Sequence, residues 1–180
     1  MLRTRLIAIL SAAALAAGGS VGFASTAGAS ALSDVALVCP GSTTVNYSPS
    51  VTDTTRPTRV AGQSQWTCNG LPAGYSATNS GTITVPLSCT DLLQSTTGTK
   101  ILRWTRSGVF AGTSTFSLTR TVTRAEGTTT VVFTGPITAG LFEGATVIET
   151  AVVPNLELDA CSTTGISQLD FTETLEVTGL

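Results

Sequence analysis

Apolar and polar residues alternate along most of the chain after residue 30, in short runs separated by glycine, proline and other turn residues. The clearest run is 82–87, where Ile83, Val85 and Leu87 share one face. Because successive side chains of a strand point to opposite faces, a period of two predicts half-buried strands. The predicted strands cover residues 34–39, 59–68, 82–87, 100–105, 113–124, 128–134, 146–153 and 169–177.

Eight or nine short strands with frequent turns and no helix are typical of an all-β domain. We therefore expect one antiparallel, immunoglobulin-like β-sandwich of about eight or nine strands, covering residues 30–180, of which 30–33 form a short N-terminal tail. A chain of about 150 residues buries roughly 70% of its unfolded surface, which is enough for one core. The order of the strands does not follow from the pattern.

Two charged residues interrupt the alternation. Arg120 and Glu173 each fall on the apolar face of a predicted strand. A lone buried charge is costly, so each residue requires a partner, a β-bulge or a position at the end of the sheet. One hypothesis is that the two pair with each other, and the alternative is that each lies at its own bulge or exposed rim.

The first 29 residues have the order of a secretory signal peptide. Arg3 and Arg5 precede an uncharged apolar run at 6–17, and small residues follow up to a cleavage site near Ala29 or Ala31. The apolar run is short for a membrane span, which needs about 20 residues. We expect a secreted, extracellular protein without a membrane anchor, because no second hydrophobic segment follows.

Four cysteines remain after the predicted leader: Cys39, Cys68, Cys89 and Cys161. An even count in an exported chain predicts two disulfides. Of the three possible connectivities we favour the sequential one, Cys39–Cys68 with Cys89–Cys161. A metal site is not expected, because the chain has no closely spaced cysteine pair and no histidine.

Charge excludes several classes of partner. Two of the nine basic residues lie in the leader, and all eleven acidic residues follow it, so the exported part is acidic. An acidic surface does not suit nucleic acid or anionic membranes, both of which select Lys and Arg. Lys100, Arg103 and Arg106 form a small basic group, which we interpret as one solvated strand face.

The residue types also limit the possible chemistry. Without histidine, the usual Ser-His-Asp, Cys-His and histidine-metal mechanisms are excluded. Paired carboxylates can catalyse glycoside hydrolysis, but spacing selects no pair among the candidates. The candidates are Glu143, Glu149, Glu157, Asp159, Asp170 and Glu173. We expect no enzyme activity, no cofactor and no metal.

Four large aromatic residues are candidates for binding: Tyr47, Trp66, Tyr75 and Trp104. A coplanar, exposed set of these rings would stack on sugars. The alternative is that they are core and rim residues, with Trp66 packed against the disulfide of the nearby Cys68. In the segment 140–144, the glycines favour a turn that anchors Phe142 in the core.

Several short motifs together give the chain a family resemblance. They are Cys39-Pro40-Gly41, residues 45–49 (VNYSP), Cys68, Ser88-Cys89 with Leu92-Leu93, residues 101–104 (ILRW), residues 134–144 (TGPITAGLFEG) and Asp159-Ala160-Cys161. With them the chain resembles an uncharacterised family of small secreted proteins of actinobacteria of the Streptomyces type. Pro136 and Ile137 depart from the Thr and Val more usual there. The resemblance implies one exported, disulfide-bonded, sandwich-like β domain with no known catalytic residues.

The function that best fits these observations is that of a secreted, non-enzymatic interaction module or adaptor. Its partner would be another secreted protein or a cell-wall glycan. One alternative is a carbohydrate- or cell-wall-binding module that uses the four aromatic residues. A second is a small inhibitor of a secreted hydrolase, which presents a long loop at residues 69–80.

Overall fold

Nine β-strands, one short α-helix and one 3-10 helix make up the part of the chain that the computed structural model describes, residues 36–154 and 158–180. The predicted signal peptide and its cleavage site lie outside the described residues. The strands are β1 (Leu37–Val51), β2 (Arg56–Thr67), β3 (Asn69–Gly70), β4 (Tyr75–Leu87), β5 (Thr96–Arg106), β6 (Val109–Ala125), β7 (Thr128–Gly140), β8 (Thr146–Pro154) and β9 (Ile166–Thr178). The helices are α1 (Cys89–Leu92) and the 3-10 helix η1 (Leu158–Ser162).

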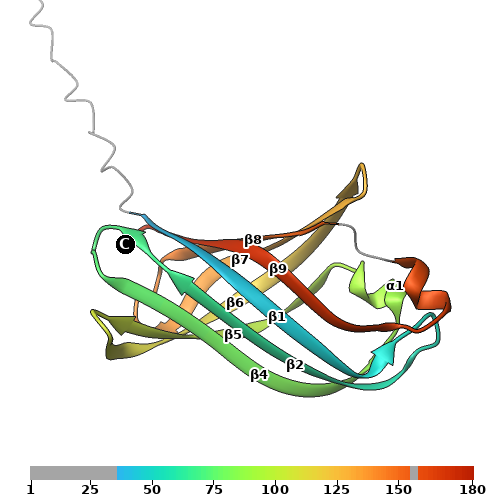
Figure 1. The fold of residues 1–180 in the computed structure, drawn as a ribbon. Helices are drawn as coiled ribbons and strands as arrows, with labels where there is room; N and C mark the ends of the chain where they lie inside the picture. Colours follow the sequence, from blue (N-terminus) through green and yellow to red (C-terminus); the bar gives the residue numbers. More distant parts are fainter. Residues whose placement is uncertain (1–35, 155–157) are drawn as a thin grey trace, which may run out of the picture. The chain divides into compact units, whose positions relative to one another are not determined.

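The strands form a closed, eight-stranded antiparallel barrel (Figure 1). Each long strand pairs with the next long strand in the chain, and β9 returns to pair with β1 over residues 37–46 and 168–177. The two-residue strand β3 pairs only with the start of β1 and is not one of the eight strands that form the barrel wall. The connectivity is therefore an up-and-down meander whose last strand closes on its first.

The predicted immunoglobulin-like sandwich is wrong. The predicted strands all lie in or overlap observed ones, but they belong to one closed sheet and not to two stacked sheets. The physical reason is that period-two alternation reports only that a strand has one buried face. Both architectures bury one face of each strand, and the ladder that separates them, β9 with β1, joins residues more than a hundred positions apart.

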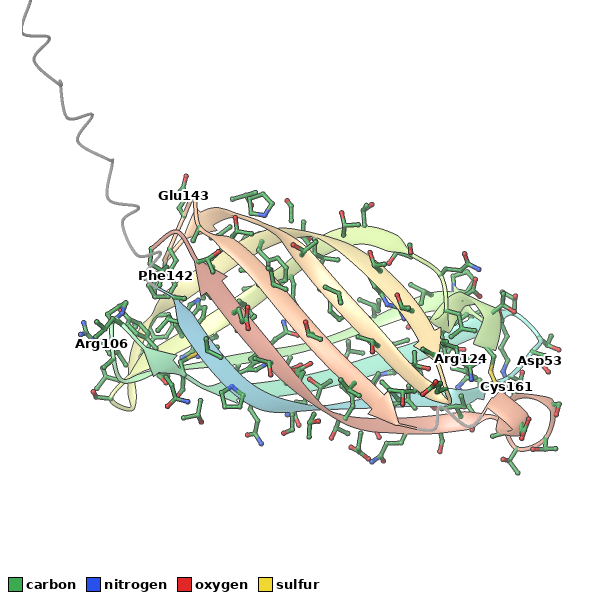
Figure 2. The ribbon with its side chains drawn as sticks, turned by 90° about the horizontal axis from the view of Figure 1, so that it is seen from above. Asp53, Arg106, Arg124, Phe142, Glu143 and Cys161 are labelled. Atoms are coloured by element: carbon green, nitrogen blue, oxygen red, sulfur yellow. A yellow bond between two sulfur atoms is a disulfide. The ribbon has the colours of Figure 1, made fainter. Side chains whose placement is uncertain are left out.

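The barrel has two ends with different structures (Figure 2). At the α1 end lie the turn between β1 and β2, helix α1 and helix η1, with Asp53 and Cys161 labelled there. At the Phe142 end lie the turns that follow β2, β5 and β7, together with Phe142 itself. The two disulfides predicted from the even cysteine count are present, Cys39–Cys68 in the core near the Phe142 end and Cys89–Cys161 at the α1 end.

An aromatic core fills the Phe142 end of the barrel. Trp104 is fully buried, and the ring of Phe142 packs edge-on against it with centroids 5.1 Å apart and against Tyr75 at 5.2 Å. Gly140 and Gly144 both have φ of 91°, a conformation that favours glycine, and they bracket the turn that directs Phe142 inward. The interpretation of 140–144 as a turn that anchors Phe142 is confirmed.

Candidate functional site

A cavity of about 270 Å³ lies inside the half of the barrel next to α1. Eleven of its fourteen lining residues are apolar, among them Val45, Val60, Val85, Val131, Phe133 and Phe171. Apart from Leu92 of α1, the lining residues come from every long strand except β5, because every second residue of a strand points inward. The volume corresponds to that of ~9 water molecules, so the space is large enough for a small organic ligand.

The cavity is open to solvent beside β4. The ladder between β4 and β5 pairs residues 75–78 with 103–106, and it forms no further pair along the described length of either strand. Next to the last pair, the Asn79 side chain donates a hydrogen bond to the Ile101 carbonyl at 2.7 Å. Beyond that point Ile83 lines the cavity yet is 59% exposed. We call this stretch, 79–87 facing 96–102, the parted seam.

Three polar side chains line the cavity: Tyr47, Arg120 and Thr129. The hydroxyl oxygen of Thr129 is buried and has no hydrogen-bond partner among the described residues. Burial raises the pKa of Tyr47 to about 12, although the positive charge of Arg120 acts in the opposite direction. Burial also lowers the pKa of Arg120, opposed by Tyr47, but a guanidinium stays protonated in proteins. The cavity therefore holds one fixed positive charge.

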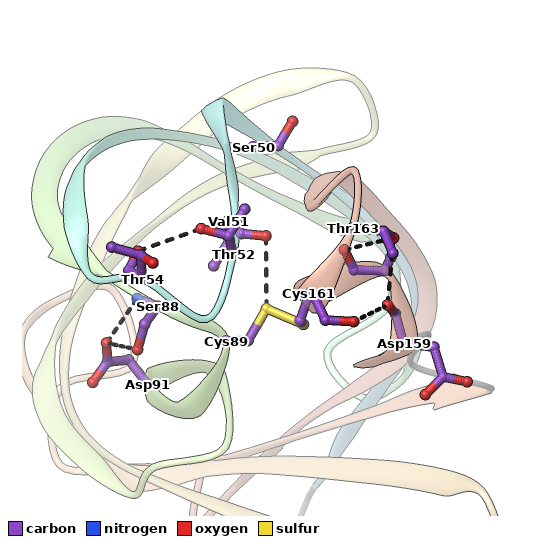
Figure 3. Close-up of a disulfide and its surroundings, with 12 residues drawn as sticks. Ser50, Val51, Thr52, Thr54, Ser88, Cys89, Asp91, Asp159, Cys161 and Thr163 are labelled. Atoms are coloured by element: carbon purple, nitrogen blue, oxygen red, sulfur yellow. Dashed lines mark hydrogen bonds between the residues drawn. A yellow bond between two sulfur atoms is a disulfide. The ribbon is translucent and has the colours of Figure 1, made fainter.

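Helix α1 closes the cavity at its end of the barrel, where Leu92 contributes to the lining. Ser88 caps the helix: its backbone N–H and its hydroxyl both donate to the carboxylate of Asp91, at 2.7 and 2.6 Å, and these bonds lower the pKa of Asp91. The disulfide Cys89–Cys161 ties α1 to η1 (Figure 3). The backbone N–H of Cys89 also donates to the Thr52 carbonyl at 2.9 Å, which fixes α1 against the β1–β2 turn.

Arg120 connects β6 to the last residue of α1 and to the segment that follows it. Its Nη1 donates to the Gln94 carbonyl at 3.2 Å, and its Nη2 donates to the Leu92 carbonyl in a short hydrogen bond. These two carbonyls lie at the C-terminal side of α1, where a positive charge is favoured by the orientation of the peptide dipoles. The same two bonds hold the guanidinium at the wall of the cavity.

A layer of buried polar residues separates the cavity from the aromatic core. Lys100 Nζ lies 2.7 Å from both carboxylate oxygens of Glu149, and the Thr43 hydroxyl lies 2.5 Å from Glu173 Oε1 and from the Ser64 hydroxyl. Glu149 is 1% exposed and Glu173 is 5% exposed. Along β9, Glu173 lies between Leu175 of the core and Phe171 of the cavity wall. We call these five residues the acid layer.

The two carboxyl groups of the acid layer are not equivalent. Glu149 has Lys100 as its counter-ion. The Glu173 carboxyl has a pKa raised to about 7, first because it is buried and second because Glu149 is negatively charged, while the hydrogen bond from Thr43 and the charge of Lys100 act in the opposite direction. Its Oε2 is buried without a hydrogen-bond partner in the described structure. Glu173 is therefore largely protonated in mildly acidic solution.

The four predicted aromatic residues do not form an exposed platform. Trp66, Tyr75 and Trp104 are buried in the aromatic core, with the Trp104 indole N–H bonded to Ser114 Oγ at 2.8 Å. Trp66 shares that cluster with Cys39 and Cys68. Only Tyr47 lies elsewhere, in the cavity wall. The coplanar, exposed set that a sugar-stacking surface requires is thus not present among these four residues.

The charged residues were placed less well by the sequence. Arg120 and Glu173 do face the barrel interior, but they do not form an ion pair, since the one salt bridge within the described ranges joins Lys100 to Glu149. The interpretation of Lys100 as part of a solvated strand face is wrong: its side chain is 16% exposed and points inward with Leu102 and Trp104. The sequence did contain a signal for this orientation, because Lys100 lies two residues before Leu102 and four before Trp104 and therefore on the same face of β5.

Within the described residues, the candidate carboxylates and the candidate inhibitory loop do not form a site at the cavity. Of the six candidate carboxylates, the structure brings together Glu149 and Glu173, and neither lines the cavity; Glu157 lies outside the described residues. The segment 69–80 is not a long loop, because β3 and β4 occupy most of it. Thr129 had no signal in the sequence, since it belongs to a run of three threonines.

The described residues hold one group with metal-ligand geometry, Asp53 with Cys89 and Cys161, but both of these cysteines are consumed by their disulfide. Among the helices of the described ranges, none has the length and apolar character to cross a bilayer. No protein-family model, no curated protein and no solved structure matches the chain. The family resemblance drawn from the motifs therefore stays a prediction.

Proposed function

We propose that the protein is an exported, non-enzymatic binding protein that holds a small, mainly apolar molecule inside its barrel. The observation that carries the proposal is the apolar cavity with its opening at the parted seam. Eight-stranded barrels are wide enough to hold one small ligand. A mainly apolar pocket with a few polar groups is the usual form of a small-molecule site.

Water reaches part of the apolar cavity wall through the opening. Burying a methylene group stabilises by about 0.8 kcal/mol, so an apolar ligand of several carbons that covers this wall gains several times that amount before the cost of association. Ile83 lines the cavity while more than half of its surface remains in water. An apolar ligand would cover it.

Export is supported by two features. The predicted leader has the order of a signal peptide. The two disulfides indicate an oxidising environment, in which such bonds persist. The proposed site of action is therefore outside the cell.

Absence of catalysis is supported by the composition of the cavity wall. The wall offers one hydroxyl from threonine, one phenol and one guanidinium, with no carboxylate and no thiol. The chain has no histidine to act as a general base. The two carboxyl groups that do come together, Glu149 and Glu173, belong to the acid layer, and Phe133 and Phe171 lie between that layer and the cavity.

A matched pair of isoleucines tests the proposal. Ile83 and Ile101 are 59% and 57% exposed, but Ile83 lines the cavity, and Ile101 lies on the outer face of β5. Because both are exposed, a change to glutamate has a small folding cost in either position. We expect Ile83→Glu to weaken binding of the neutral fluorescent probe 1-aminoanthracene about tenfold or more, and Ile101→Glu to leave it unchanged.

The probe is titrated at pH 8 by fluorescence, with circular dichroism as a check that both variants fold. No binding to the parent protein, or an equal loss in both variants, would overturn the proposal.

A second candidate function is binding to a macromolecular partner, and one surface favours it. The hairpin of β5 and β6 exposes Ile101, Val109 and Phe110, with the Arg103 guanidinium 4.3 Å from the centre of the Phe110 ring. An exposed aromatic residue beside an arginine is typical of interface centres. If the protein captures a stoichiometric partner from the producer's culture fluid, Phe110→Ser should abolish capture and Ile83→Glu should not.

A further inference from the structure

We propose that the ligand is an amphiphile of the fatty-acid type, and that Arg120 binds its carboxylate head while the apolar wall receives its chain. The inference rests on the proposed function, since it names the class of molecule that the cavity selects.

The cavity lining carries a positive charge. Arg120 is the one ionised side chain of the lining, and the lining contains no acidic residue. Its hydrogen bonds within the described structure go to two backbone carbonyls, which carry no net charge. A cation that is partly removed from water without a counter-ion is unfavourable, and a bound anion relieves that cost. The cavity is thus electrostatically complementary to an anionic head group.

The unused donors point to a carboxylate. A guanidinium has five N–H donors in a planar fork, and Arg120 uses two of them on the Gln94 and Leu92 carbonyls. Pairs of parallel N–H groups match the two oxygens of a carboxylate. Thr129 on β7, opposite Arg124, adds to the same lining a buried hydroxyl that has no partner among the described residues. Tyr47 contributes a phenol close enough for its pKa to respond to Arg120.

The acid layer fixes the orientation of the chain. Beyond Phe133, at the opposite end of the cavity, the nearest charged group is the Lys100 ammonium, which is already paired with Glu149. At pH 8, with Glu173 ionised, the acid layer has one positive and two negative side chains, so its net charge is negative and disfavours an anionic head group there. The head therefore lies at the α1 end beside Arg120, and the chain extends along Val131 and Phe133 toward the opening at Ile83.

The experiment compares three amphiphiles of equal chain length at pH 8, below their micelle concentrations: decanoate, 1-decanol and decyltrimethylammonium. Binding to the full exported chain is measured by isothermal titration calorimetry. The parent protein should bind decanoate at least about tenfold more tightly than 1-decanol, because hydrogen bonds to a charged partner add that much, and more tightly still than the cationic amphiphile.

Variants then assign the preference to one residue. Arg120→Met should weaken decanoate binding about 10- to 100-fold and change 1-decanol binding by less than about threefold. Arg120→Lys keeps the charge without the planar fork and should give an intermediate affinity for decanoate. The matched control is Arg59→Met, which removes an exposed arginine from the outer face of β2 and should leave both affinities unchanged.

The outcomes separate the two proposals. If no amphiphile binds the parent protein, the proposed function itself fails. If 1-decanol binds the parent as tightly as decanoate, or if Arg120→Met retains the full affinity for decanoate, the cavity is a ligand site but the inference about the carboxylate is wrong. Because Arg120 also holds the segment after α1, Arg120→Met could unfold; the three-ligand comparison on the parent protein then decides alone.

Discussion

Replacing Glu173 by glutamine should abolish a pH dependence of stability that originates in the acid layer. The carboxyl of Glu173 is 5% exposed, its Oε1 accepts a hydrogen bond from Thr43, and its neighbour Glu149 is already negative. Ionising Glu173 therefore places a second negative charge in a buried site. Glutamine has nearly the same shape, can still accept from Thr43 and cannot ionise.

The magnitude follows from the pKa of Glu173, about 7 in the folded protein against its ordinary value of 4.5. That difference corresponds to about 3 kcal/mol. The folded state holds the proton more tightly than the unfolded chain, so the stabilisation is fully present below about pH 4.5 and is lost as the pH rises through about 7. The free energy of unfolding should therefore fall by about 3 kcal/mol, mostly between pH 5 and 8. The chain has no histidine to titrate in that window.

The assay is urea unfolding of the parent and of Glu173→Gln at several pH values from 5 to 8, followed by the fluorescence of the buried Trp66 and Trp104. The two proteins should be about equally stable at pH 5, and the variant should be more stable by about 3 kcal/mol at pH 8. Glu176→Gln, on the outer face of the same strand, should follow the parent. A parent whose stability rises across this range, or a variant with the parent's slope, would refute the reasoning.

Two further predictions concern buried charge and close backbone packing. Lys100→Met should destabilise the protein by about 3–5 kcal/mol at pH 8 in urea unfolding, because Glu149 then remains buried without its counter-ion. A loss below about 1 kcal/mol would show that groups other than Lys100 stabilise the buried charge of Glu149. Gly135→Ala should destabilise the protein by about 2 kcal/mol or more, because the added Cβ would lie 1.7 Å from the Ser117 carbonyl oxygen. Gly81→Ala, with no atom within 4 Å of the added Cβ, should cost less than about 1 kcal/mol. Equal thermal midpoints for the two variants would contradict this prediction.

The positions of the strands could be predicted from the sequence, because a half-buried strand produces a local alternation of apolar and polar residues, as at Ile83, Val85 and Leu87. It also identified Arg120 and Glu173 as exceptions that need an explanation. What those residues contact could not be predicted, because the partners of Glu173 come from β1 and β8 and those of Arg120 from α1 and the segment after it. Such contacts depend on the closure of the barrel, which no local pattern encodes.

The cavity could not be predicted for a related reason. Its lining is a set of ordinary apolar strand residues, the same types that fill the aromatic core at the other end. What distinguishes the two halves is the size of the inward side chains: Trp66 and Trp104 fill one half, and valines such as Val45 and Val60 leave space in the other. That contrast appears only when the register of all strands is known.

The ladder between β1 and β9 has a consequence for how the chain reaches its native state. Every other ladder between the long strands joins strands that follow one another in the chain, so its contacts are local. The β1–β9 ladder must close a loop of more than a hundred residues. The hydrogen bond between Thr43 and Glu173 lies on this seam. A slip of one residue in this ladder would turn Glu173 and the apolar residues on its face out of the barrel, so the contacts of the acid layer favour the native register of the least local ladder.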